Sequence, residues 1–323
     1  MTGAGSTFDQ PLFSRAFYYY SQANPKVTVS YAAVGSGTGE SDIESETVNF
    51  GASDVPLSPD TGNGGTILEI PVVLGGVAIS YNVPGVPQGL KLTGTVLANI
   101  FLGNVTKWND PSIQNLNPGV SLPDQTIETV HRSDSSGTSY IFTNYLNDVD
   151  SAWSSSGPGV SKSPTWTKGN PNNIGGSGNS GVAADIANTQ YSIGYVELAY
   201  ALQGSLHYAQ MQNQAGTFLY PSLASISAAA SQFPNVSYQN FSIDNAPGSG
   251  SYPIAGYSWA LVYQNQTNEA NGVALGKLFD WESSTGQDQA SAIGYAPLPS
   301  NVQTLAHNTL LQMEYNGKPL FTS

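Results

Sequence analysis

The sequence predicts an α/β fold in two lobes. Short apolar runs typical of strands alternate with segments of helical length along the whole chain, which is the pattern of mostly parallel sheets flanked by helices. The chain has 323 residues, more than one ordinary core organises, and 39% of them are hydrophobic. We therefore expect two cores.

The expected strands and helices follow from the spacing of apolar residues. Residues 27–33 (VTVSYAA) alternate like a half-buried strand, and residues 70–81 form a nearly continuous apolar run. Shorter strands are expected at residues 127–130, 193–196 and 259–263. Helices are expected at residues 12–22, 97–101, 139–146, 182–187 and 271–281. Two stretches rich in Ser, Gly, Pro and Asn, residues 151–181 and 244–252, are predicted to be long surface loops.

The composition excludes several kinds of partner and site. Only 10% of the residues are charged and the net charge is −13, so nucleic acid and anionic lipid are repelled. Without cysteine the chain has no disulfide, no thiol catalysis and no cysteine-ligated metal. The acidic balance does not exclude an anionic ligand, because local backbone dipoles can hold an anion against the net charge.

Three loops share a design that suits an anion. Residues 3–8 (GAGSTF), 35–39 (GSGTG) and 135–139 (SSGTS) each precede a helical segment. A helix start carries free N–H groups and a partial positive charge. Small residues let the backbone approach an oxyanion, and Ser and Thr add hydroxyl donors. One such loop is most simply a turn, whereas three together predict an oxyanion site.

Arg132 lies beside the third loop and is one of only nine Lys and Arg residues. An arginine can direct two donors to one phosphate group. Asp134, two residues later, could hold the guanidinium in place. The alternative interpretation is an Arg–Asp pair on the surface.

Asp54 lies among small and apolar residues in the segment 51–57 (GASDVPL), so we expect it to be partly buried. An ionised carboxylate accepts a hydrogen bond from phosphate, which keeps an O–H near neutral pH, and repels sulfate, which has none. Asp54 would then distinguish the two anions. The structural alternative is a helix cap or a turn residue.

At these positions the sequence resembles the phosphate-binding subunit of the phosphate ABC importer (PstS type). The resemblance covers nearly the whole chain and is ordered along it. It includes residues 3–8 and 35–36, then 48–58 (VNFGASDVPLS), 72–85 (VVLGGVAISYNVPG), 100–119 (IFLGNVTKWNDPSIQNLNPG), 131–146 (HRSDSSGTSYIFTNYL) and 193–201 (IGYVELAYA).

The resemblance implies the two-lobe periplasmic-binding-protein fold (type II), with a cleft between the lobes. Lobe I would combine residues 1–80 with 258–323, and lobe II would be residues 81–257, with crossing strands near 77–82 and 257–263. Phosphate would be held by hydrogen bonds alone. The implied ligand residues are Thr7, Phe8, Ser36, Asp54, Arg132, Ser136, Gly137 and Thr138, with Asp134 orienting Arg132.

Two positions depart from the family pattern. His131 stands where a second basic residue often precedes the arginine, and Ser135 replaces a glycine of the usual GSGTS loop. Neither change removes a ligand group.

The implied function is capture of inorganic phosphate outside the cytoplasm and delivery to the membrane subunits of an ABC permease. We expect a monomer, tethered to the membrane in its mature form, without cofactor, metal or enzymatic activity. Two alternatives stay open, namely a binder of another oxyanion (arsenate, sulfate or molybdate) and a phosphatase-like enzyme. Sites for N-glycosylation occur at Asn104, Asn235, Asn240 and Asn265.

Overall fold

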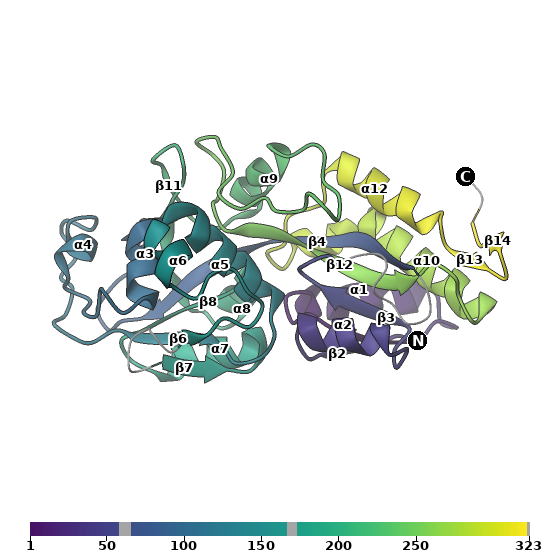
Figure 1. The fold of residues 1–323 in the computed structure, drawn as a ribbon, viewed down its shortest axis with the longest axis horizontal. Coiled ribbons are helices and arrows are strands. Elements are labelled where there is room, and N and C mark those ends of the chain that lie inside the picture. The colour runs from purple at the N-terminus through teal and green to yellow at the C-terminus, as the bar shows by residue number, and fades with distance from the viewer. Residues whose placement is uncertain (58–65, 167–172, 322–323) are drawn as a thin grey trace. The chain divides into compact units, whose positions relative to one another are not determined.

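The computed structural model describes residues 1–57, 66–166 and 173–321. The chain forms two compact units. The first comprises Met1–Leu74, Phe233–Ser242 and Tyr257–Ser323, and the second comprises Gly75–Gln232 and Ile243–Gly256. In Figure 1 the purple start and the yellow end of the chain both belong to the first unit. Both units combine strands and helices, which confirms the predicted α/β class. The lobe boundaries implied by the resemblance stay a prediction.

The sheet of the first unit places two loop-bearing strand ends side by side. Its order is β2 (Ser30–Ala33), β1 (Thr2–Gly5), β3 (Phe50–Ser53) and β12 (Ala255–Tyr263), followed by the beginning of β4 (Ile67–Asn82). β1 is parallel to β2 and β3, whereas β12 is antiparallel to β3. The carboxyl ends of β1, β2 and β3 therefore meet at one edge of the sheet, where ligands bind in open α/β sheets.

The helices of the first unit cover an aromatic core. They are α1 (Gln10–Ala23), α2 (Ser36–Glu44), α10 (Glu269–Ser283), α11 (Asp288–Ser291) and α12 (Ser300–Leu310), with the short helix η2 (Thr285–Gln287) and the hairpin β13 (Glu314–Tyr315) and β14 (Lys318–Pro319). The Phe13 ring of α1 contacts Phe17, Tyr31 and Phe50. Phe13 is fully buried, which contributes about 1.5–3 kcal/mol of hydrophobic stabilisation.

The second unit repeats the design. Its sheet runs β4, β8 (Ser192–Glu197), β6 (Glu128–Arg132) and β7 (Asn173–Gly176), and β9 (His207–Tyr208) also pairs with β4. A smaller sheet contains β11 (Phe218–Leu219), β10 (Gln210–Gln212) and β5 (Lys91–Leu92). The helices are α3 (Gly94–Phe101), α4 (Pro111–Gln114), α5 (Gly137–Val149), α6 (Ser151–Ser156), α7 (Gly178–Asn188), α8 (Leu198–Gln203) and α9 (Leu223–Ser231). β6 is parallel to β7 and β8 and leads into α5.

The predicted strands and helices all appear, within a few residues, as β2, β4, β6, β8 and β12 and as α1, α3, α5, α7 and α10. The prediction of a long loop at residues 151–181 is wrong in part, because α6, β7 and the start of α7 lie there; residues 167–172 are outside the described part of the chain. α9 and α12 were not predicted. Residues 244–252 contain neither helix nor strand, as expected.

The second anion loop is largely helical, which corrects the prediction of a loop at residues 35–39. α2 begins at Ser36, inside the segment that was predicted to precede the helix. Its two early glycines lower helix propensity and so make the segment look like a loop. Gly39 is needed for packing, since a Cβ there would lie 2.3 Å from the Cα of Gly5.

Glu69 is a buried carboxyl on β4 in the first unit. Burial raises its pKa to about 8. The charge of Glu40 acts in the same direction, and the Leu57 backbone acts in the opposite direction. Because the folded protein binds this proton more tightly than the unfolded chain, the contribution of Glu69 to stability is complete below about pH 4.5 and is lost as the pH rises through about 8.

We therefore expect Glu69→Gln to be more stable than the wild type at pH 9 and close to it at pH 5. At pH 9 the free energies of unfolding of the two proteins should differ by on the order of 3 kcal/mol. Thermal unfolding across this pH range measures it. Glu269→Gln, at an exposed position at the start of α10, is the control and should show no such dependence. Parallel melting curves for the wild type and Glu69→Gln would contradict the prediction.

Candidate functional site

Three loops of the first unit pack against one another at the carboxyl edge of its sheet. The N–H of Ser6 donates to the carbonyl of Ala52 (2.9 Å), and the N–H of Gly35 donates to the carbonyl of Gly5 (2.8 Å). The N–H of Asp54 donates to Ser36 Oγ (3.4 Å). These contacts bring together the loops that carry Thr7, Phe8, Ser36 and Asp54.

The loop after β1 is held at several points. The hydroxyl of Tyr31 donates to the carbonyl of Ser6 (2.7 Å), and that of Tyr295 donates to the carbonyl of Phe8 (2.6 Å). Within the loop, the N–H of Phe8 donates to Ser6 Oγ (3.0 Å). The side chains of Thr7 and Phe8 are buried. The loop is therefore preorganised, and in this structure the Phe8 N–H is engaged inside it.

α2 starts at the edge of the same group of loops. Gly35 is its N-cap, with φ at +95°, a left-handed conformation that favours glycine. Ser36, the first helical residue, is buried. The first N–H groups of a helix have no partner within it, so this end can accept an anion.

Asp54 follows β3 and is 1% exposed, which confirms the predicted burial. Its Oδ1 accepts a hydrogen bond from the hydroxyl of Ser258 on β12 (2.6 Å). Ser258 Oγ also lies 2.9 Å from Oδ2 of Asp9. Asp9 and Ser258 were not identified from the sequence; the one available signal was the acidic residue directly after the GAGSTF motif.

The second unit holds Arg132 at the end of β6. The side chain of Arg132 is 1% exposed, so the alternative of a surface pair does not hold. Asp134 binds the guanidinium side-on, with Nε–Oδ1 at 2.8 Å and Nη2–Oδ2 at 2.5 Å. The N–H of Gly178, at the start of α7, also donates to Asp134 Oδ1 (3.0 Å). Asp134 therefore holds the guanidinium in one orientation.

The ionic form of this pair is favoured. Burial acts to raise the pKa of Asp134, but the hydrogen bonds and positive charge of Arg132 and the N–H of Gly178 outweigh it and hold the pKa below its ordinary value. Arginine stays protonated at any physiological pH. The pair is therefore charged at neutral pH.

The guanidinium of Arg132 keeps N–H groups that could donate to a ligand. A guanidinium has five N–H groups, of which Asp134 takes two and Thr138 Oγ1 takes one, from Nη1 at 3.3 Å. One N–H on each terminal nitrogen has no partner among the residues that the structure describes. Thr138 Oγ1 also accepts from Asn179 (3.1 Å), so its own hydrogen is available to donate.

The loop at residues 135–139, in the second unit, leads into α5. Ser136 is the N-cap, and its hydroxyl accepts from the N–H of Ser139 (3.0 Å). Gly137 and Thr138 are the first helical residues, and all three predicted positions are buried. The positive end of a 13-residue helix thus lies next to Arg132. In the second unit the structure therefore brings together Arg132, Asp134, Ser136, Gly137 and Thr138.

Tyr195 on β8 supports this loop and was not identified from the sequence. Its hydroxyl accepts from the N–H of Arg132 (3.1 Å) and lies 2.6 Å from Ser139 Oγ. Burial raises the pKa of Tyr195 to about 12, so the phenol stays neutral.

His131 packs rather than binds. Its ring stacks on Trp166, with 4.9 Å between the ring centroids, and its Nδ1 lies 2.9 Å from the carbonyl of Arg132. Burial lowers the pKa of His131 although the backbone contact raises it, so the uncharged ring is favoured.

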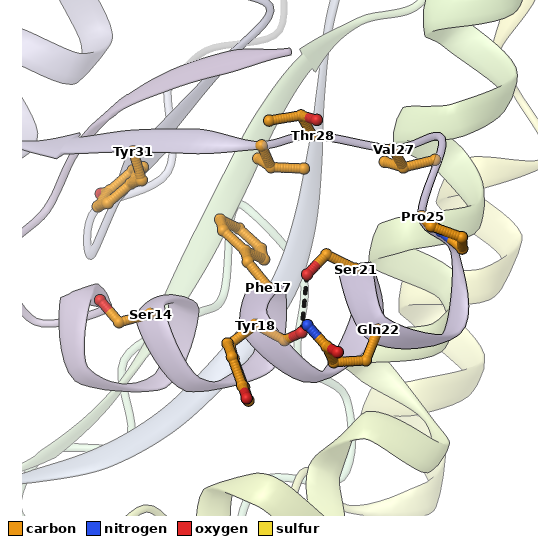
Figure 2. A pocket seen from close by; sticks show the side chains of 10 residues that line it. Ser14, Phe17, Tyr18, Ser21, Gln22, Pro25, Val27, Thr28 and Tyr31 are labelled. Carbon is orange, nitrogen blue, oxygen red and sulfur yellow. Dashed lines mark hydrogen bonds between the residues drawn. The ribbon is translucent and has the colours of Figure 1, made fainter.

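A separate hollow of about 600 Å³ lies between α1 and the β2 segment (Figure 2). Its lining is uncharged and includes the rings of Phe17, Tyr18 and Tyr31. The predicted ligand residues are not part of that lining. Within the described residues no group of three His, Cys, Asp or Glu could hold a metal ion, and no helix there has the length and apolarity of a membrane span.

Known proteins share this sequence and this fold. Residues 1–281 match the family model of the PBP superfamily domain. The phosphate-binding protein PstS of Pasteurella multocida is 40% identical over 306 residues, which cover 94% of this chain and 87% of that protein. PstS of Haemophilus influenzae is also 40% identical over 306 residues, 94% of this chain and 90% of that protein.

Among solved structures, a human phosphate-binding apolipoprotein has a TM-score of 0.75 at 20% identity, covering 95% of this chain and 93% of that one. At this identity the likeness concerns the fold. The fold is therefore that of the two-lobe binding proteins, and the chain belongs to the PBP superfamily and, within it, to the PstS family of phosphate-binding proteins.

Proposed function

We propose that this protein binds inorganic phosphate outside the cytoplasm and delivers it to the membrane subunits of an ABC permease, without catalysing a reaction on it. The observation that carries the proposal is the buried Arg132, held side-on by Asp134 with one further N–H on each terminal nitrogen. Such a fork fits two oxygens of one tetrahedral anion. Membership of the PstS family supports the choice of anion.

Each unit carries its own set of predicted ligand groups. In the first unit, backbone N–H groups and hydroxyls donate to phosphate and one carboxylate accepts from it; the residues are Thr7, Phe8, Ser36 and Asp54. The Phe8 N–H would exchange its bond to Ser6 Oγ for one to phosphate. In the second unit all groups donate; the residues are Arg132, Ser136, Gly137 and Thr138. A buried carboxylate among donors suits an anion that brings a hydrogen of its own.

Titration calorimetry tests the proposal on protein freed of phosphate by unfolding and refolding. We expect tight binding of phosphate, competition by arsenate, which is also protonated, and little binding of sulfate. Tight sulfate binding with weak phosphate binding would instead support the alternative of a different oxyanion carrier.

The enzyme alternative has its own test. Turnover of a generic phosphate ester that disappears in Ser136→Ala would favour a phosphatase. We expect no turnover, because a phosphatase needs a nucleophile with a base or a metal cluster. The relatives carry the name of binding proteins, which favours the same answer.

We further propose that the mature protein is a monomer tethered at the membrane surface. Size-exclusion chromatography with light scattering tests the monomer, and fractionation of the native host's membranes tests the tether.

A further inference from the structure

One serine hydroxyl lies between two buried carboxyl groups in the first unit. Ser258 Oγ is 2.6 Å from Asp54 Oδ1 and 2.9 Å from Asp9 Oδ2. All three residues are at most 1% exposed. The partners are far apart in sequence, 204 residues for Asp54 and 249 for Asp9, so the fold builds this contact.

The hydroxyl of Ser258 has too few hydrogens to donate to both carboxyl groups. A serine hydroxyl has one hydrogen and can donate to only one of the two carboxyl oxygens. If both carboxyls were ionised, the second contact would set a lone pair of Ser258 against a negative oxygen at 2.9 Å with no hydrogen between them. The second contact is a hydrogen bond only if that carboxyl carries a proton and donates it to Ser258.

The two distances indicate which carboxyl is protonated. A bond from a hydroxyl to an ionised carboxylate is typically 2.5–2.7 Å long, whereas neutral O–H···O bonds are slightly longer. The Ser258–Asp54 contact falls in the charged range and the Asp9–Ser258 contact does not. The two distances fit an arrangement in which Asp9 donates to Ser258 and Ser258 donates to Asp54.

We propose that Asp9 retains a proton at neutral pH and, through Ser258, keeps Asp54 ionised as the acceptor for the phosphate hydrogen. This inference rests on the proposed function and deepens it, because it makes the charge of the first unit's ligand set depend on pH. With Asp9 protonated, the two carboxyls add one negative charge beside the anion. When Asp9 loses its proton to solvent, they add two.

The surroundings of Asp9 act in opposite directions on whether its carboxyl is ionised or protonated. Asp9 is the N-cap of α1, and a helix N-terminus favours an ionised carboxylate, but its side chain makes no capping hydrogen bond. Nearby carboxyls favour the protonated form. The charged and titratable groups on the surrounding elements include two carboxyls, Glu40 (bound by Ser53 Oγ at 2.7 Å) and Glu69 on β4. They also include Arg15 on α1 (bound to Gln289), Tyr257 beside Ser258, and Tyr295, which donates to the Phe8 carbonyl. Tyr20 on α1 and Tyr263 on β12 are further titratable groups of these elements.

Infrared difference spectroscopy of the phosphate-free protein tests the proton directly. The wild-type minus Asp9→Asn spectrum at pH 7 should contain the C=O band of a protonated carboxyl. The wild-type minus Asp288→Asn spectrum, for an exposed aspartate of the same unit, should contain only ionised carboxylate bands. If Asp9→Asn also removes only carboxylate bands, the inference is wrong.

A second variant keeps the test valid if Asp9→Asn fails to fold. Ser258→Ala removes the acceptor of the Asp9 proton, so the protonated C=O band should move to higher frequency. An unchanged protonated region in Ser258→Ala would show that Asp9 gives no proton to Ser258.

Phosphate affinity gives the functional readout. The Kd of the wild type relative to that of Asp9→Asn should be near one at neutral pH and rise about tenfold once Asp9 loses its proton, because a unit charge is then added a few ångströms from the anion. The ratio cancels the titration of phosphate itself. A ratio of about ten already at pH 7 would mean that Asp9 is ionised there and overturns the proposal. If neither protein binds phosphate, the proposed function fails, while the infrared result still decides whether Asp9 is protonated.

Discussion

Replacing Arg132 with alanine is expected to weaken phosphate binding by about a hundredfold or more. The substitution removes two charge-assisted donors, each contributing on the order of 1.5–3 kcal/mol. It also leaves Asp134 in place without its cation, so a buried position that was neutral overall becomes negative. Titration calorimetry at constant pH and salt measures the loss.

Three further variants make the Arg132→Ala result interpretable. Arg132→Lys keeps the charge but not the fork, and should fall between the wild type and alanine. Arg15→Ala, on α1 and bonded to Gln289, is the matched control and should bind phosphate normally. Combining Arg132→Ala with Asp134→Asn should recover stability but not affinity. Binding by Arg132→Ala within threefold of the wild type would remove Arg132 from the site.

Asp54→Asn is expected to abolish discrimination between phosphate and sulfate. The amide keeps the size of the side chain but offers donors and no longer carries a charge. Phosphate loses the acceptor of its O–H, a bond to a charged group worth about 1.5–3 kcal/mol, while the repulsion of sulfate disappears. The ratio of the two affinities should fall by about a hundredfold.

Competition between phosphate and sulfate, followed by calorimetry, measures that ratio. Asp288→Asn removes the same charge from an exposed position and should leave the ratio unchanged. Equal losses of affinity for both anions in Asp54→Asn would mean that Asp54 does not detect the phosphate hydrogen.

The sequence alone was enough to predict the parts of the candidate site whose residues lie close together in the chain. Arg132, Asp134 and the loop at Ser136 lie within five residues, so strand end, counter-ion and helix start could be recognised together. The burial of Asp54 followed from its apolar neighbours. The alternation of strands and helices was likewise a local signal, and it located the main elements of both units.

Long-range contacts could not be predicted in this way. Ser258 lies in an apolar strand between two aromatic residues, where nothing in the local pattern points to Asp9 or Asp54. Asn179 and Tyr195 reach Thr138 and Arg132 only because β6, β8 and α7 are neighbours in the folded unit. The start of α2 was placed too late because Gly37 and Gly39 oppose a helical interpretation. Of the two, Gly39 is required by the close packing of the loops.

The close packing of the backbone around Gly5 and Gly39 limits how the ligand specificity of this protein can be changed. A methyl group on Gly39 would meet the Gly5 backbone at 2.3 Å, and one on Gly5 would meet the Ala52 carbonyl at 2.1 Å. Main chain lies against main chain here, so no side chain can be trimmed to widen the space. Redesign for bulkier anions, such as organic phosphonates, would have to begin with the loop around Arg132, where side chains set the shape.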